Sequence, residues 1–139
     1  MQANNIQYVV GDGKDEFYRF FNLDEKPTKI LMNDSLGYFS PDDLRDLLIY
    51  IIKEVGIFTF YITGVPNDNL KWNFYNTEER RLRYLNCLER GDVTFDGIGN
   101  WWSPDQIKQI CDELGLRYEI NNQPDFMSNY RSNVLIYHD

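Results

Sequence analysis

The chain has 139 residues, which is enough for one domain with a modest hydrophobic core. Apolar residues make up 42% of it, which indicates a folded rather than a disordered protein. The formal net charge of −8 argues against nucleic acid or an anionic membrane as the main partner, because both attract clustered Lys and Arg. No apolar run predicts a membrane span, and the first residues lack a signal-peptide pattern. Two isolated cysteines, Cys87 and Cys111, are typical of a reducing compartment, so we expect a cytoplasmic protein.

The N-terminal segment predicts a short strand over Ile6–Val10 that ends abruptly at Gly11-Asp12-Gly13. Glycines at the end of a strand allow a sharp turn or the close approach of a ligand. Aromatic residues at helical spacing then predict a short helix over Lys14–Phe21.

The central part of the chain predicts a strand, a helix and a second strand. The strands are Lys29–Asn33 and Ile57–Thr63, and the helix starts at Ser40-Pro41 and ends near Glu54. Both strands are continuously apolar, which is typical of strands covered on both faces. A strand–helix–strand unit of this kind favours parallel pairing with a right-handed crossover.

Residues 66–102 are too long for an ordinary connection, and we interpret them as a helical, aromatic-rich insertion. Its helix is predicted over Thr77–Arg90, with Asn76 as a possible cap. A further helix follows Ser103-Pro104, and two closing strands are predicted over 116–120 and 133–137. Because no helix separates these strands, they either pair antiparallel or stand apart in the sheet. The pattern indicates the α/β class, with a partial doubly wound sheet, mostly parallel, a C-terminal antiparallel hairpin and helices on both faces.

Three strand ends point to the same edge of this sheet if it is parallel. They are Gly11-Asp12-Gly13, Asn33-Asp34-Ser35 and the segment 64–68. Ligands of open parallel sheets bind beyond the carboxyl ends of the strands, so these segments together predict one ligand site. Taken singly, each of them is also ordinary turn chemistry. Asp12 and Asp34 are suited to accept hydrogen bonds from ribose hydroxyls or an adenine amino group.

Other common kinds of site find little support in the sequence. The glycines do not form a dinucleotide or phosphate-binding loop, which argues against a kinase or a dehydrogenase. His138 is the only histidine, so a histidine-based triad is not expected, and the two cysteines do not have metal-ligand spacing. The pair Trp101-Trp102 has two equal interpretations: it forms an aromatic wall over a substrate, or it fixes the insertion to the body of the protein.

In their order, these segments resemble the later half of class I S-adenosylmethionine-dependent methyltransferases, which have a Rossmann-like fold. The resemblance rests on Tyr8–Asp12, the segment 29–39 with its Asn33-Asp34 motif, the helix and strand over 40–63, and the closing pattern 102–138. The insertion is similar to those of enzymes that methylate small molecules or sugars. The resemblance implies one methyltransferase-like domain over 1–139, with S-adenosylmethionine as cofactor.

The resemblance also implies roles for particular residues. Asn33 and Asp34 would line the methyl-transfer site as catalytic residues. The cofactor would contact the residues Gly11, Asp12, Gly13, Asn33 and Ser35. The acceptor would contact Tyr38, Asn100, Trp101 and Trp102. No metal is implied.

One departure from the family pattern affects the functional expectation. The family's glycine-rich cofactor loop and the acidic residue that follows it are not in this sequence. We therefore expect a truncated or split transferase domain that is inactive as an isolated chain, and that is completed by a missing N-terminal segment, a partner chain or self-association. Another outcome is that Ile6–Val10 pairs directly with Lys29–Asn33. The alternative functions are a non-catalytic assembly module with the same fold, and an unrelated doubly wound domain that binds another nucleotide-like ligand.

Overall fold

The computed structural model describes Tyr18, residues 26–92 and residues 96–139. The expected strand Ile6–Val10, the Gly11-Asp12-Gly13 motif and the helix over Lys14–Phe21, apart from Tyr18, lie outside the described residues. In the part of the chain that the structure describes, no helix is both long and apolar enough to cross a bilayer.

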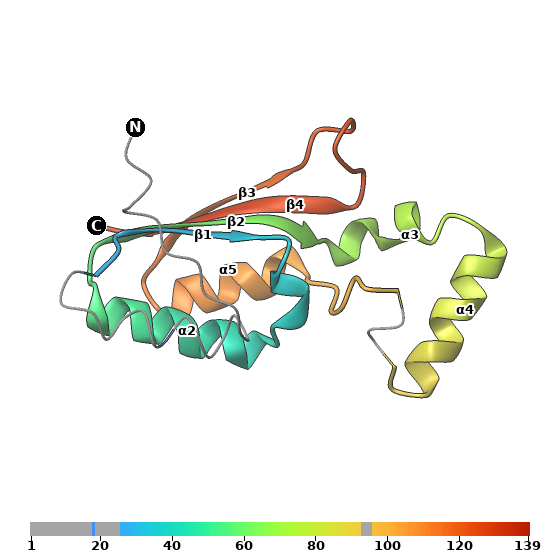
Figure 1. Cartoon of the computed structure of the whole chain (residues 1–139), viewed down its shortest axis with the longest axis horizontal. Coiled ribbons are helices and arrows are strands. Elements are labelled where there is room, and N and C mark those ends of the chain that lie inside the picture. Colours follow the sequence, from blue (N-terminus) through green and yellow to red (C-terminus); the bar gives the residue numbers. More distant parts are fainter. Residues whose placement is uncertain (1–17, 19–25, 93–95) are drawn as a thin grey trace, which may run out of the picture.

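The described strands form one sheet in the order β1-β2-β4-β3 (Figure 1). β1 is parallel to β2, whereas β4 runs antiparallel to both β2 and β3. The predicted closing strands therefore pair with each other, and β4 inserts between β2 and β3. The strands are β1 Lys29–Asn33, β2 Phe58–Pro66, β3 Arg117–Asn122 and β4 Arg131–His138.

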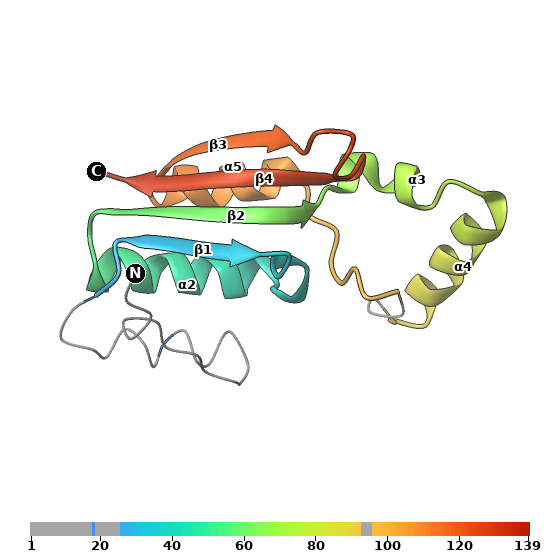
Figure 2. The ribbon, with the colours of Figure 1, turned by 45° about the horizontal axis from the view of Figure 1, so that its top comes forward.

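Two helices with similar N-termini pack against the sheet: α2, Pro41–Glu54, and α5, Pro104–Glu113. Each begins with proline after a serine N-cap, and each has a capping box in which the serine and the third helical residue bond reciprocally. Both starts confirm the expectation from the sequence. Figure 2 shows both helices on the same side of the sheet.

The core lies between these helices and the sheet. Phe58, Phe60 and Ile62 alternate along β2 with exposed residues, and all three are buried against the helices. The stripe of α2 supplies Leu44, Leu47, Leu48 and Ile51, and α5 supplies Ile107, Ile110 and Cys111. Burial raises the pKa of the Cys111 thiol to about 12, so it packs as a neutral apolar group.

The opposite face of the sheet, formed by the odd-numbered residues of β1 and by those of β2 up to Thr63, is here called the uncovered face. On it, Leu31 is 67% exposed and Tyr61 is 39% exposed. The mixed α/β class and the antiparallel hairpin are confirmed, but two details need correction for the described residues. The sheet is not mostly parallel: one of its three strand pairings is parallel, because β4 enters the sheet antiparallel beside β2. The helices α2 and α5 cover one face of the sheet, where helices on both faces were expected.

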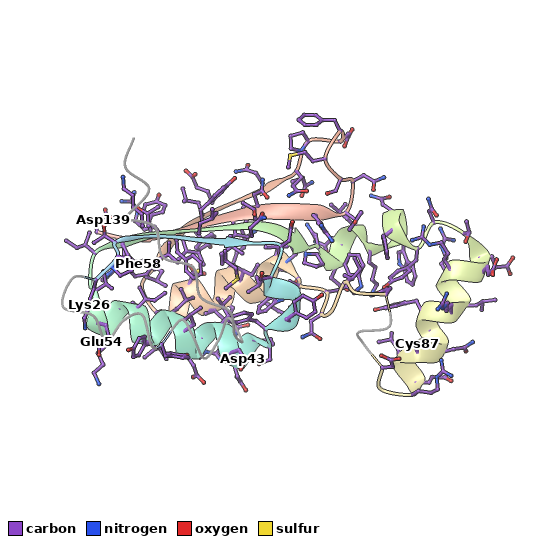
Figure 3. The ribbon with its side chains drawn as sticks, in the orientation of Figure 1. Lys26, Asp43, Glu54, Phe58, Cys87 and Asp139 are labelled. Atoms are coloured by element: carbon purple, nitrogen blue, oxygen red, sulfur yellow. The ribbon has the colours of Figure 1, made fainter. Side chains whose placement is uncertain are left out.

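Beyond β2 the chain forms an arm that extends away from the sheet (Figure 1). The arm consists of η2 Asp68–Leu70, α3 Lys71–Phe74 and α4 Glu78–Glu89. Cys87, which is buried in α4, lies far from sheet residues such as Phe58 (Figure 3). Thr77 rather than Asn76 caps α4, because its hydroxyl accepts a hydrogen bond from Arg80 N at 3.1 Å.

Candidate functional site

Polar side chains gather where β1 and β2 end and β4 begins. They surround a cavity of about 450 Å³, within the range of about 300–1,000 Å³ that is typical of ligand pockets. We call it the strand-end pocket. Its position at the carboxyl ends of a parallel pair is the place expected for a ligand site in an open α/β sheet. The residues that line it are Asn33, Asp34, Tyr61, Thr63, Gln123, Met127, Arg131 and Asn133.

Asp34 has an unusual backbone conformation directly after β1. Its φ is 53°, in the left-handed region, where non-glycine residues are uncommon. The backbone N–H of Asp34 donates to Thr63 O at 2.9 Å, which continues the β1–β2 ladder and fixes this conformation. Asp34 Oδ1 lies 3.6 Å from Arg131 Nη1, so the site contains a half-exposed carboxylate paired with a guanidinium. Backbone strain held at a polar site is a feature of functional positions.

Gly64 makes this position of the carboxylate possible. A Cβ on Gly64 would lie 1.7 Å from Asp34 Oδ1, and Gly64 itself has φ of 70°. It lies where the β2–β4 register shifts between Ile62 and Val65, as in a β-bulge. The bulge therefore provides room for Asp34 against the backbone of β2.

A network of amides holds the opposite wall of the pocket. Asn133 Oδ1 accepts from Gly64 N at 3.1 Å and from Gln123 Nε2 at 3.0 Å. Gln123 Oε1 in turn accepts from the Ser128 hydroxyl at 2.8 Å. Arg131 Nε is buried and has no hydrogen-bond partner among the described residues. A buried N–H without an acceptor is uncommon.

The sequence predicted some members of the pocket and missed others. Asn33 and Asp34 line it, and the Thr63 hydroxyl donates to Asn33 Oδ1. Ser35 is adjacent but does not line it; its hydroxyl donates to Asn33 O at 2.9 Å. The missed residues come from β2, β4 and the loop before β4: Tyr61, Thr63, Gln123, Met127, Arg131 and Asn133. For Gln123, Met127 and Arg131 the only sequence signal was a long polar loop over 121–132, with no sign of which segment it would contact.

Three of the residues expected at the acceptor bind the segment 96–102 to the turn after β1. Tyr38 OH donates to Gly97 O at 2.9 Å, and Asn100 Nδ2 donates to Phe39 O at 3.3 Å. Trp102 is 2% exposed, and its Nε1 donates to Leu36 O at 3.0 Å. Trp102 thus has the packing role that was the alternative interpretation. Its indole is inaccessible to an acceptor.

Trp101 takes a different position, in an aromatic cluster at the base of the arm. Its Nε1 donates to Tyr75 OH at 3.3 Å. Neighbouring ring centroids within the cluster are 4.3–6.3 Å apart, in the range of favourable aromatic pairs. The cluster consists of Trp72, Phe74, Tyr75, Tyr84, Trp101 and Tyr130.

Tyr75 gives the arm a measurable pH dependence. Burial, and next the hydrogen bond that its hydroxyl donates to Asp96 Oδ2, raise the pKa of Tyr75 above its usual 10.0. As the pH rises, the unfolded state loses the Tyr75 proton at a lower pH than the folded state does. The stabilisation that Tyr75 contributes is therefore fully present below about pH 10 and is lost as the pH rises above it. Tyr75→Phe removes this group, so the stability difference between wild type and variant should shrink from pH 9 to pH 11 (roughly one unit either side of the usual tyrosine pKa). Urea unfolding at each pH measures it; a constant difference would contradict the assignment.

The pocket suits positioning and proton acceptance more than nucleophilic or metal chemistry. Asp34 is the one carboxylate among the described lining residues. His138 lies at the far end of β4, where its Nδ1 contacts Gly56 O. No group of three or more His, Cys, Asp or Glu side chains within the described ranges could hold a metal ion.

No family model matches the chain, and no curated protein matches it. Among solved structures, the chain is similar to magnesium protoporphyrin IX methyltransferase (ChlM) from Synechocystis PCC 6803 with bound SAH, at 13% sequence identity and a TM-score of 0.48. The match covers 86% of this chain and 48% of that structure, so the chain spans about half of its length.

Proposed function

We propose that the chain is part of an S-adenosylmethionine-dependent methyltransferase-like domain, that it acts in the cytoplasm, and that the strand-end pocket is its methyl-transfer site. The acceptor in this proposal is a small molecule or a sugar. One observation carries the proposal: Asn33 and Asp34, the residues of the motif that suggested the family, line a pocket at the carboxyl end of β1. The pocket adds Arg131, which the motif did not include.

The described residues fit part of such a cofactor. Asp34 accepts hydrogen bonds from hydroxyl or amino groups, and the guanidinium of Arg131 suits a carboxylate or the face of an aromatic ring. The buried Arg131 Nε is a donor without an acceptor among the described residues. When bound, S-adenosylmethionine supplies the methyl group. The residues of the chain hold the reactants in line, and Asp34 is placed to accept a proton if the acceptor must lose one.

The uncovered face supports the further proposal that this domain is completed by residues outside the described part, in a partner chain or a second copy. Leu31 and Tyr61 are large apolar side chains that the described helices leave exposed. The same observation favours the second candidate function, a non-catalytic assembly module. The two candidates differ in whether the strand-end pocket binds the cofactor.

Calorimetric titration of the purified chain with S-adenosylmethionine, up to millimolar concentration, distinguishes the two. The methyltransferase proposal predicts weak binding that Asp34→Ala reduces by about tenfold or more, because one charge-assisted hydrogen bond contributes about 1.5–3 kcal/mol. Absence of heat, or equal affinity of the Asp34→Ala variant, would contradict the proposal that the isolated chain binds the cofactor at this site. The solution mass, measured in parallel, tests completion by self-association: a dimer supports it, and a monomer counts against it.

A further inference from the structure

The helix α4 presents three leucines to solvent. Leu82, Leu85 and Leu88 follow one another at intervals of three residues, so they lie along one side of the helix. Each of them is between 43% and 54% exposed. We call these three residues the leucine stripe. Single exposed leucines are common on protein surfaces, but a contiguous apolar row is a feature of interaction surfaces.

Another side of α4 attaches it to the arm. Tyr84 and Cys87 are buried there. The Tyr84 ring is stacked on Tyr75, with ring centroids 4.3 Å apart, and meets the edge of Trp72 at 5.9 Å. Figure 1 and Figure 2 both show α4 at the end of the molecule that is farthest from the sheet. The leucine stripe can therefore be reached by a partner that approaches from solvent.

Two opposite charges lie at equal distances from the middle of the leucine stripe. Arg81 precedes Leu85 by four residues and Glu89 follows it by four, so each lies about 6 Å from Leu85 along the helix axis. Residues four apart are neighbours on a helix surface, so both charges flank the leucines. Neither side chain forms an ion pair among the described residues.

Arg81 is oriented by the arm without being saturated by it. Its Nε donates to Tyr75 O at 3.0 Å, and its guanidinium carbon lies 5.9 Å from the centroid of the Trp72 ring. A guanidinium has five N–H donors, so those on its two terminal nitrogens remain for a carboxylate. Glu89 is exposed and can supply that carboxylate from a second copy of the chain.

A second copy fits this pattern when its α4 runs antiparallel to the first. In a two-fold symmetric pair centred on Leu85, each residue before Leu85 lies opposite the residue equally far after it. Leu82 is then opposite Leu88 of the second copy, and Arg81 is opposite Glu89 of the second copy. A parallel pair would instead place Arg81 beside Arg81 and Glu89 beside Glu89, which like-charge repulsion disfavours.

The end of α4 adds no charge that opposes this arrangement. Glu78 lies seven residues before Leu85, on the same side of the helix. The helix ends at Glu89, and Gly91 has a left-handed φ of 71°, which turns the chain away from the helix axis. No helical residue of the second copy therefore stands opposite Glu78.

We propose that α4 is a dimerisation helix: two copies of the chain associate antiparallel through the leucine stripe, and Arg81 of each copy pairs with Glu89 of the other. Three half-exposed leucines and one charge pair per copy make a small interface, so the dimer is weak and depends on concentration. This surface is distinct from the uncovered face of the sheet, and the proposal does not rest on cofactor binding in the strand-end pocket.

Sedimentation equilibrium of the purified chain, from roughly 10 µM to 1 mM, tests the proposal. The mass should rise from that of one chain towards that of two. Leu85→Gln should weaken dimerisation by at least about tenfold, because a central leucine is lost from both copies. Leu85 is half-exposed, so the variant should keep its fold, which circular dichroism checks. A chain that stays monomeric to 1 mM, or unchanged dimerisation of Leu85→Gln, would overturn the proposal.

Leu31→Gln is the matched control, since it makes the same substitution at an exposed leucine of the uncovered face. This variant should dimerise as the unaltered chain does. If Leu31→Gln abolishes the dimer and Leu85→Gln leaves it intact, the dimer belongs to the uncovered face and the arm proposal is wrong. The titration with S-adenosylmethionine has a separate readout, so failure of the cofactor proposal can be distinguished from failure of this one.

Exchange of the charges tests the antiparallel direction. Glu89→Arg should weaken dimerisation by about three- to tenfold, because it places two arginines opposite each other at both ends of the stripe. The double variant Arg81→Glu, Glu89→Arg should restore dimerisation, since the opposite charges are then paired again with their positions exchanged. A double variant that dimerises no better than Glu89→Arg alone would contradict the pairing of Arg81 with Glu89.

Discussion

Replacement of Trp102 by alanine is expected to lower the free energy of unfolding by about 3–5 kcal/mol, the usual cost of removing a large buried aromatic side chain. Trp102 is 2% exposed within the main core cluster. Its Nε1 donates to Leu36 O at 3.0 Å, and its backbone N and O bond to Pro66 and Asp68. The residue therefore joins three segments: the turn after β1, the end of β2 and the segment before α5. Urea unfolding monitored by circular dichroism gives the free energy directly.

Trp101→Ala is the natural control for this experiment. Trp101 is adjacent in sequence and equal in size, but it is only half-buried and its Nε1 contacts Tyr75 in the arm. Its replacement should cost less than that of Trp102, because less of its surface leaves water on folding. Equal losses for the two variants would show that Trp102 does not have the anchoring role described here.

Gly64→Ala should be the other strongly damaging single substitution, with a loss of about 2–5 kcal/mol. The left-handed backbone costs about 1–2 kcal/mol for a residue with a Cβ, and overpacking adds about 1–3 kcal/mol. The new Cβ would overlap Asp34 Oδ1, at 1.7 Å, and would displace the carboxylate from Arg131. The variant should therefore also lose any ligand binding in the strand-end pocket.

Gly91→Ala isolates the backbone part of this effect. Gly91 has φ of 71°, nearly the same as Gly64, but a Cβ there would meet nothing within 4 Å. The difference between the two variants measures the contact with Asp34. In an Asp34→Ala background, Gly64→Ala should cost about as much as Gly91→Ala. An unreduced cost in that background would contradict the steric explanation.

Local sequence signals were sufficient for the starts of α2 and α5 and for two residues of the strand-end pocket. Ser40-Pro41 and Ser103-Pro104 begin helices because the serine side chain and the fixed φ of proline act within one turn. Asn33 and Asp34 line a pocket because the carboxyl ends of parallel strands share one edge of a sheet. These relations depend on nearby residues or on a general rule of sheet geometry.

Features that depend on distant segments could not be predicted in the same way. A continuous apolar run does not show whether the second face of a strand is covered, and Leu31 is exposed in the structure. Arg131 reaches Asp34 only because β4 runs antiparallel beside β2, which local pattern left undecided. Trp101 and Trp102 are neighbours of the same type, yet Trp101 faces the arm and Trp102 faces the core. Their orientation follows from the bridge between Trp102 and Asn67, which are 35 residues apart in the numbering.

The central claim is that the strand-end pocket holds the cofactor, and amide NMR spectra recorded during titration with S-adenosylmethionine test it most directly. The expected result is a set of shifts at Asn33, Asp34, Thr63, Gly64 and Arg131 that saturates with ligand, and that needs about tenfold more ligand or above in the Asp34→Ala variant. The arm and the far end of the sheet near His138 should remain unshifted. Shifts that avoid the strand-end pocket would contradict the claim. The absence of shifts at several millimolar ligand would also contradict it, because the binding free energy would then be weaker than about −4 kcal/mol.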